Sequence, residues 1–226
     1  MARPATRGSG VAPGRRPGPR AWSGNPRMVG VASSQARLQE FLARLSAAPC
    51  CAALTSESRL DDALESRVGI VFVLRADGLT LKPLVKRAHA AGKLVAVHLD
   101  LIDGIRADRA GVAWLGRSGV DAVISSHGQL MPAIHREGIV AIHRLLLIRR
   151  GLLDAAFAAV TKSGADIVEV LPGVILPEVR GLLPRLRVPL LAGGFIRTAD
   201  EARAVLAAGS IAVTTSAENL WHADLR

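Results

Sequence analysis

The stretch Leu190–Ser216, LLAGGFIRTADEARAVLAAGSIAVTTS, contains two short apolar runs separated by a segment that favours a helix. The first run ends in the pair Gly193–Gly194, and the second ends in the hydroxyl cluster Thr214–Ser216. Between the runs, Thr198 and Glu201 have the spacing of a capping box, which marks the start of a helix. The stretch therefore predicts a strand, a helix and a second strand in succession.

The same alternation recurs along the chain from residue 50 onward. Eight apolar runs alternate with polar segments that favour a helix: Cys50–Leu54, Val68–Leu74, Lys93–Asp100, Val120–Ser125, Gly138–Leu146, Ala165–Leu171, Val188–Gly193 and Ser210–Thr215. Nearly continuous apolar strands between helices are typical of a parallel sheet that is covered on its outer side. Eight such units predict an α/β protein with a single (β/α)₈ TIM barrel, and an open doubly wound sheet is the alternative.

Two further segments lie before the first strand. Residues 33–47 predict a helix that either plugs the barrel floor or packs against its side. Residues 1–30 hold six arginines, no acidic residue, five prolines and six glycines, a composition that predicts a disordered tail. This tail is interpreted as a solvated leader or an over-long start, with a phosphate-contacting arm as the alternative. We therefore divide the chain into a tail at residues 1–30 and a barrel domain at residues 31–226.

Composition narrows the classes of function. The chain has a net charge of +10, but residues 31–226 carry 23 basic and 19 acidic side chains, so the predicted barrel is only at +4. Aromatic residues make up 3% of the chain, which argues against a platform that stacks single-stranded bases. The two cysteines are the adjacent Cys50 and Cys51, which suit neither an ordinary disulfide nor a metal motif. With no apolar run of transmembrane length, we expect a cytoplasmic protein without membrane contact.

Polar side chains gather at the carboxyl ends of five predicted strands. They are His98 and Asp100 with Asp103 just beyond, His143 and Arg144, Glu169, Gly193–Gly194, and Thr214–Ser216. In a TIM barrel these strand ends meet at one mouth, where active sites lie. His98 and Asp100 share the parity of one strand and are expected to point the same way. Glu169 is bracketed by apolar residues, and a buried carboxylate is costly without a partner.

The glycine pair and the hydroxyl cluster together favour a phosphate site. Glycines let the backbone approach an anion, hydroxyls add donors, and phosphate sites after the seventh and eighth strands recur in this fold. The four lysines, Lys82, Lys86, Lys93 and Lys162, all fall away from the predicted mouth, which disfavours a Schiff-base aldolase. No cofactor or resident metal is expected, although Asp100, Glu169 and a ligand phosphate together leave a metal open.

Four stretches resemble characteristic segments of one family, the glycerol-3-phosphate-responsive antiterminators or GlpP proteins. They are HLDLIDG (98–104), EVLPGVI (169–175), AGGFIRT (192–198) and AVTTSAENLW (212–221). The likeness extends from about residue 33 to residue 221. It implies a TIM barrel that binds glycerol-3-phosphate at its mouth and acts on the leader mRNA of glycerol-utilisation genes to prevent premature termination.

By position, the resemblance implies roles for individual residues. The phosphate would be held by Gly193, Gly194, Thr215 and Ser216, and the glycerol end of the pocket would be faced or shaped by His98, Asp100, Arg144 and Glu169. At two places this chain departs from the family. His127 stands in ISSHG where the family tends to have a basic residue, and His143 and Arg149 stand in HRLLLIRR where the family tends to have glutamine and aspartate.

Two functions of different classes follow. The first is a non-catalytic regulator that binds glycerol-3-phosphate and leader mRNA, and the resemblance favours it. The second is an enzyme that acts on a small phosphorylated sugar, with Asp100 or Glu169 as general base and His98 or His143 as acid. The sequence indicates no particular oligomeric state.

Overall fold

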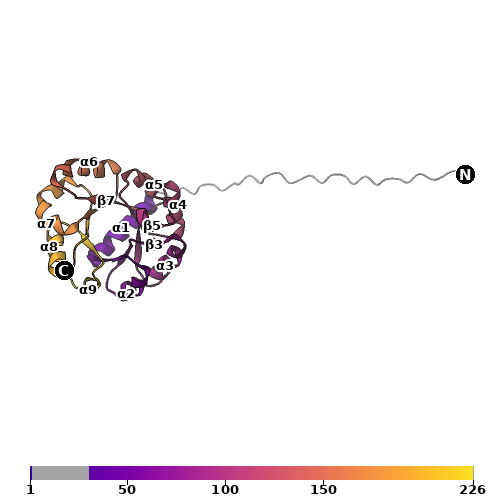
Figure 1. The fold of residues 1–226 in the computed structure, drawn as a ribbon, viewed down its shortest axis with the longest axis horizontal. Helices are drawn as coiled ribbons and strands as arrows, with labels where there is room; N and C mark the ends of the chain where they lie inside the picture. The colour runs from indigo at the N-terminus through magenta and orange to yellow at the C-terminus, as the bar shows by residue number, and fades with distance from the viewer. Residues whose placement is uncertain (2–30, 226) are drawn as a thin grey trace.

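The computed structural model describes Met1 and residues 31–225, and its centre is a closed barrel of eight parallel strands (Figure 1). The strands are β1 (Cys50–Leu54), β2 (Ile70–Val73), β4 (Leu94–His98), β6 (Ala122–Ser125), β7 (Val140–Leu146), β8 (Ile167–Leu171), β9 (Leu190–Gly193) and β10 (Ala212–Thr215). They follow one another round the barrel, and β10 pairs in parallel with β1, Cys50 opposite Val213. This closure confirms the predicted TIM barrel and contradicts the open sheet.

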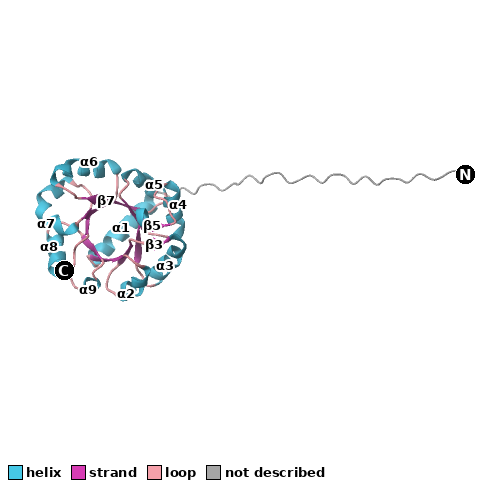
Figure 2. Ribbon diagram, viewed as in Figure 1, coloured by secondary structure: helices cyan, strands magenta, loops and turns pink. Residues whose placement is uncertain are grey.

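Helices form an outer ring around the strands (Figure 2). They are α2 (Leu60–Glu65), α3 (Gly78–Ala90), α4 (Arg109–Ser118), α5 (Met131–Arg136), α6 (Leu153–Ser163), α7 (Leu176–Val179), α8 (Ala199–Ala207) and α9 (Glu218–Trp221). Short 3₁₀ turns are η1 (Glu57–Arg59), η2 (Leu99–Leu101), η3 (Gly128–Leu130), η4 (Arg150–Leu152), η5 (Gly173–Ile175) and η6 (Arg180–Arg185). Apolar helix faces pack on the outward strand residues, as each βα unit of the sequence predicts.

The helix α1 (Val31–Ala47) closes the floor of the barrel, which decides between the two predicted positions. It lies within the ring of strands in Figure 1. Phe41 and Leu45 are fully buried and pack against the inward side chains of the strands. Arg37 and Arg44 donate to the carbonyl oxygens of Gly138 and Gly92, which lie just before β7 and β4. The amino-terminal end of the barrel is therefore sealed by apolar contact and fixed by hydrogen bonds.

The third barrel strand is shorter than predicted. It ends at His98 because the turn η2 begins at Leu99, so the alternation of strand side chains stops before Asp100. A small parallel pair, β3 (Ala76–Asp77) and β5 (Ile102–Asp103), follows β2 and η2 and was not predicted. Asp103 therefore belongs to a short strand and not to a loop.

The helix of the opening stretch begins as predicted. Thr198 accepts from the N–H of Glu201, and the carboxylate of Glu201 accepts from the N–H of Thr198, which completes the capping box of α8. Residues 2–30 of the predicted tail lie outside the described residues. Among the described helices, none is both long and apolar enough to cross a membrane.

Candidate functional site

An ion pair between Arg144 and Glu169 lies inside the barrel near its carboxyl end. The two residues face each other in register on β7 and β8. Two guanidinium nitrogens of Arg144 lie 2.8 and 2.7 Å from Oε2 of Glu169. The hydroxyl of Thr214, on β10, donates to Oε1 of Glu169 at 2.7 Å. Glu169 is only 1% exposed, so its carboxylate has the partners that its burial requires.

Gly193 makes room for this arrangement. A Cβ atom at Gly193 would lie 2.9 Å from Oε1 of Glu169 and closer still to the hydroxyl of Thr214. Any other residue would therefore displace one of these two side chains. The glycine at the end of β9 is required by a close approach of side chains from β8 and β10.

The loop after β9 turns through two residues of left-handed conformation. Gly194 has φ of 83° and Phe195 has φ of 62°, which is uncommon for a residue other than glycine. Among the described residues, no hydrogen bond uses the backbone N–H of Phe195 or of Ile196. Two neighbouring N–H groups without protein partners are the kind of feature that binds an anion.

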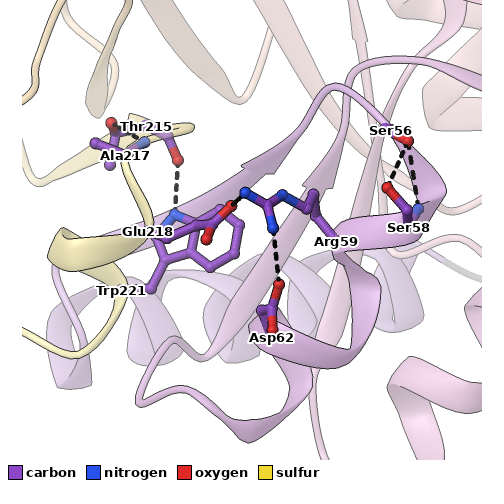
Figure 3. A network of polar contacts seen from close by, with 8 residues as sticks. All are labelled: Ser56, Ser58, Arg59, Asp62, Thr215, Ala217, Glu218 and Trp221. Carbon is purple, nitrogen blue, oxygen red and sulfur yellow. Dashed lines mark hydrogen bonds and ion pairs between the residues drawn. The ribbon is translucent and has the colours of Figure 1, made fainter.

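Thr215 joins the loops that follow β9 and β10. Its hydroxyl donates to the carbonyl oxygen of Ile196 at 2.6 Å and accepts from the N–H of Ala217 at 3.0 Å. Figure 3 shows Trp221, whose indole N–H donates to the carbonyl oxygen of Thr215 at 2.8 Å. In the same view Arg59 links Glu218 to Asp62 and so ties this loop to η1 and α2. The hydroxyl proton of Thr215 is thus used within the protein, whereas Ser216 is exposed.

These groups border a cavity of about 590 Å³ at the carboxyl ends of β7 to β10. Six of the eight predicted site residues line it: Arg144, Glu169, Gly193, Gly194, Thr215 and Ser216. The two that do not line it are His98 and Asp100. The structure therefore brings the predicted phosphate residues together with the Arg144–Glu169 pair.

His98 is buried in the same end of the barrel without a hydrogen-bond partner. Its side chain is 3% exposed, and no described residue pairs with either ring nitrogen. Burial and the nearby positive charge of Arg144 lower the pKa of His98 to about 4, so the ring is neutral at pH 7. A buried nitrogen without a hydrogen-bond partner lowers the stability of the fold. Such groups are found at functional sites.

The alternation of one strand does not set the direction of Asp100 as predicted, although the charge of Asp100 still acts on the pKa of nearby His98. The carboxylate of Asp100 accepts from the hydroxyl of Ser125 at 2.6 Å and from the N–H of Ser126 at 2.8 Å. The cause is the turn η2, which starts between His98 and Asp100 and ends the strand alternation. Asp100 therefore fixes the end of β6.

His143 lies on the outer side of the barrel, and this placement contradicts its predicted role as acid at the mouth. It follows Ile142 and precedes Arg144, both inward, so strand alternation turns it toward the helices. Its Nδ1 lies 3.0 Å from the hydroxyl of Ser163 on α6, and burial lowers its pKa. The other two departures from the family pattern, His127 and Arg149, are both exposed.

Metal ligands do not gather in the part of the chain that the structure describes. Within residues 31–225, no three His, Cys, Asp or Glu side chains lie close enough together to hold a metal ion. Asp100 and Glu169, which the sequence left open as ligands, have separate protein partners. Cys50 and Cys51 are free and buried, and burial raises the pKa of Cys50 to about 12.

Sequence reasoning missed several residues of the cavity wall. Leu171, Phe195, Ile196, Arg197 and Asn219 also line it. All five stand within the motifs at 169–175, 192–198 and 212–221, so the signal was their position beside the glycine pair and the hydroxyl cluster. Their chemistry gave none, because a leucine or an isoleucine beside a strand end is normally part of the core.

Fold and cavity together define a (β/α)₈ barrel with a cavity of mixed polar and apolar lining at the carboxyl ends of its strands. Within this class, the chain belongs to the family of glycerol-3-phosphate responsive antiterminators, whose pattern matches residues 50–221. It is 30% identical to the Escherichia coli K12 protein YgcP over 175 residues, which cover 76% of this chain and 91% of YgcP.

Two solved structures support the membership. The glycerol uptake operon antiterminator regulatory protein of Listeria monocytogenes is 32% identical with a TM-score of 0.72, over 76% of this chain and 94% of that one. The glycerol uptake operon antiterminator-related protein of Thermotoga maritima is 27% identical with a TM-score of 0.68, over 76% and 96% of the two chains.

Proposed function

We propose that this chain is a non-catalytic regulator that binds glycerol-3-phosphate in the cavity and acts on the leader mRNA of glycerol-utilisation genes. The observation that carries the proposal is the cavity itself, which joins the loops after β9 and β10 to Arg144 and Glu169. A phosphoester with a polar end fits such a site, since one wall offers N–H and hydroxyl donors and the other a fixed charged pair. The family membership supports this ligand.

The phosphate binds at the β9 and β10 loops in this proposal. The backbone N–H groups of Phe195 and Ile196 and the hydroxyl of Ser216 donate to it, and exposed Arg197 adds positive charge. Gly194 lets the backbone approach the anion. Thr215 supports the site by holding the two loops together, a change from the direct contact that the sequence predicts.

The glycerol end faces Arg144 and Glu169, and His98 lies close to both without lining the cavity. A neutral histidine has one ring nitrogen that donates and one that accepts, which is what a hydroxyl group needs. His98 lies close enough to Arg144 and Glu169 for their charges to act on its pKa. A ligand hydroxyl, or a water that it orders, would give the buried ring the partner that the protein does not supply. Asp100 shapes this end of the cavity because its carboxylate accepts a hydrogen bond from Ser125.

The same contacts argue against catalysis. Among the described residues no lysine lines the cavity, and Lys93 donates to the carbonyl oxygens of Ser66 and Val68, before the strands begin. Glu169 pairs with Arg144 and Thr214 and is a poor general base, because its oxygens already accept hydrogen bonds. His143 is on the outer side. A regulator is the better account of these residues.

Isothermal titration calorimetry with glycerol-3-phosphate tests the proposal. Gly194→Asp places a carboxylate beside the bound phosphate, and we expect affinity to fall by about a hundredfold or more. Gly92→Asp is the matched control, because Gly92 also has positive φ (72°) but lies before β4 at the other end of the barrel. It should bind like the parent. No binding by the parent, or equal loss in both variants, would overturn the assignment.

The RNA part of the proposal is tested in the same preparations. Binding of a structured glycerol-operon leader RNA is measured by filter retention with and without glycerol-3-phosphate, for the full chain and for a chain that lacks residues 2–30. We expect the deletion to reduce the salt dependence of RNA binding and to preserve the effect of the ligand. If the shortened chain binds no RNA while the full chain binds all RNAs alike, the protein is a phosphoester-binding barrel with a basic tail.

A further inference from the structure

A continuous apolar surface lies beside the ligand cavity, where β7, β8 and β9 end. A groove of about 320 Å³ runs along it, and its large side chains are exposed: Leu146 by 51%, Ile148 by 78% and Phe195 by 70%. Together with Leu171 and Pro172 in the same groove, we name these residues the apolar patch. Single exposed apolar residues are ordinary, but a contiguous groove of them marks a site of interaction.

The end of β7 creates this surface. Leu147 is buried, and its N–H donates to the carbonyl oxygen of Leu171 at 2.7 Å, so the chain stays extended beyond the barrel. Its neighbours Leu146 and Ile148 alternate with it and stand in solvent. The sequence LLLI thus places two large aliphatic side chains outward at a position where a barrel strand normally gives way to a polar loop.

Two charged side chains of opposite sign border the patch. A second groove, of about 260 Å³, shares Leu147 and Ile148 with the first and is also lined by Arg149 and Glu178. Both charged side chains are exposed, and neither forms an ion pair with another side chain that the structure describes. A partner that carries both a negative and a positive group at its rim would complement these charges.

We propose that the partner is a second copy of this chain, docked through the same patch. An interface with twofold symmetry places one surface against itself, so that Arg149 of each copy meets Glu178 of the other and Ile148 packs in the centre. RNA fits less well, because Glu178 repels phosphates and Phe195 is the only aromatic ring among the described patch residues on which a base could stack. A copy of the chain supplies the apolar area and both charges at once.

The patch also touches the ligand site. Leu171, Gly194 and Phe195 line both the patch groove and the ligand cavity. A copy seated on Phe195 contacts the loop whose N–H groups are proposed to bind phosphate. Ligand binding and self-association are then linked, and each changes the affinity of the other by the same factor. This link rests on the proposed function, whereas the association itself does not.

Sedimentation velocity of the full chain over a range of concentrations tests the proposal, with and without glycerol-3-phosphate. We expect a monomer–dimer equilibrium that Ile148→Glu weakens by about tenfold or more. Arg149→Glu and Glu178→Arg should each weaken it, and the double variant should recover most of the loss because the charges are exchanged. Leu79→Glu is the control, since Leu79 is 88% exposed at the start of α3, far round the barrel from β7 in Figure 1.

Each outcome decides the proposal. A monomer at every concentration, a double variant no better than the single ones, or an equal effect of Leu79→Glu overturns the dimer. Loss of RNA affinity in Ile148→Glu with an unchanged dimer assigns the patch to RNA instead. Association that is the same with and without glycerol-3-phosphate, in a chain that calorimetry shows to bind it, overturns the link alone. Thermal melting of each variant confirms that it folds.

Discussion

The floor and the mouth of the barrel differ in how far their polar groups are hydrogen-bonded within the protein. At the floor, Asp121 accepts from the N–H of Val95 and pairs with His89 at 2.8 Å. Asp166 repeats the arrangement with the N–H of Ala141 and with His135 at 3.1 Å, one aspartate before β6 and the other before β8. Each aspartate ties a helix to the start of a strand, which stabilises the fold.

At the mouth, several groups have no partner among the residues that the structure describes. His98 is buried with both ring nitrogens unpaired, Phe195 is exposed at positive φ, and the patch residues Leu146 and Ile148 stand in solvent. Each feature costs stability or solubility in the free chain. The comparison teaches that the floor serves the fold, while the mouth keeps groups free for a ligand or a second chain.

Breaking the buried ion pair between Arg144 and Glu169 at the mouth should have the largest effect. Arg144→Met leaves the buried carboxylate of Glu169 with Thr214 alone, and we expect the free energy of unfolding to fall by about 4 kcal/mol in urea at pH 7. At the floor, Arg44 forms an exposed ion pair with Glu40 at 3.6 Å and an exposed hydrogen bond to the carbonyl oxygen of Gly92, so Arg44→Met should cost no more than about 2 kcal/mol.

A double variant separates charge from packing in this prediction. Arg144→Met with Glu169→Gln removes both charges and should recover more than half of the loss, because a neutral amide can still accept from Thr214. Equal losses in Arg144→Met and Arg44→Met would contradict the contrast between the two ends.

The barrel could be predicted from the sequence because its signal is repeated and local. Eight apolar runs and the capping box of Thr198 and Glu201 each follow from short-range physics. The position of α1 was left open, since an amphipathic helix fits either the floor or the side. The first error came at Asp100, where a strand ended two residues early and the parity argument no longer applied.

The candidate site could be predicted only in part. Arg144, Glu169 and the glycine pair were placed correctly at the cavity, because strand ends converge in this fold. The contact of the Thr215 hydroxyl depends on a neighbouring loop that no local pattern contains, whereas the outward side of His143 follows from strand alternation once Arg144 faces inward. The isolation of His98 also cannot be predicted, since an unsatisfied atom is defined by what its neighbours do not offer.

Replacing His98 should sharpen the comparison by separating stability from binding. His98→Leu keeps a similar volume and removes two unpaired nitrogens, so we expect the free energy of unfolding at pH 7 to rise by about 1 kcal/mol. The affinity for glycerol-3-phosphate should fall by about tenfold in calorimetry, since a hydroxyl loses its partner. A stabilised variant with unchanged affinity would show that His98 does not contribute to ligand binding.

Acid unfolding provides a second measure of the same residue. The pKa of His98 is about 4 in the fold against an ordinary value of 6.5, so the unfolded chain takes up the proton first as the pH falls. The contribution of the neutral ring to the free energy of unfolding is therefore complete above about pH 6.5. It decreases by up to roughly 3 kcal/mol as the pH falls to about 4. His98→Leu should remove this part of the acid sensitivity.

The smallest expected effect lies at the floor and has the opposite sign. A hydrogen bond to Asp166 raises the pKa of His135, so its stabilisation is present below the ordinary value and is lost as the pH rises through the raised value. The side chain is about one third exposed, and we expect His135→Gln to cost no more than about 1 kcal/mol at pH 5.5 and close to nothing at about pH 8.5. Urea unfolding at both pH values measures this cost.

In an Asp166→Asn background the pH dependence of the His135→Gln effect should vanish, because the carboxylate that holds the proton is gone. A cost that is equal at both pH values would mean that the contact is an uncharged hydrogen bond, and the two ends of the barrel would then differ in packing but not in their response to protons.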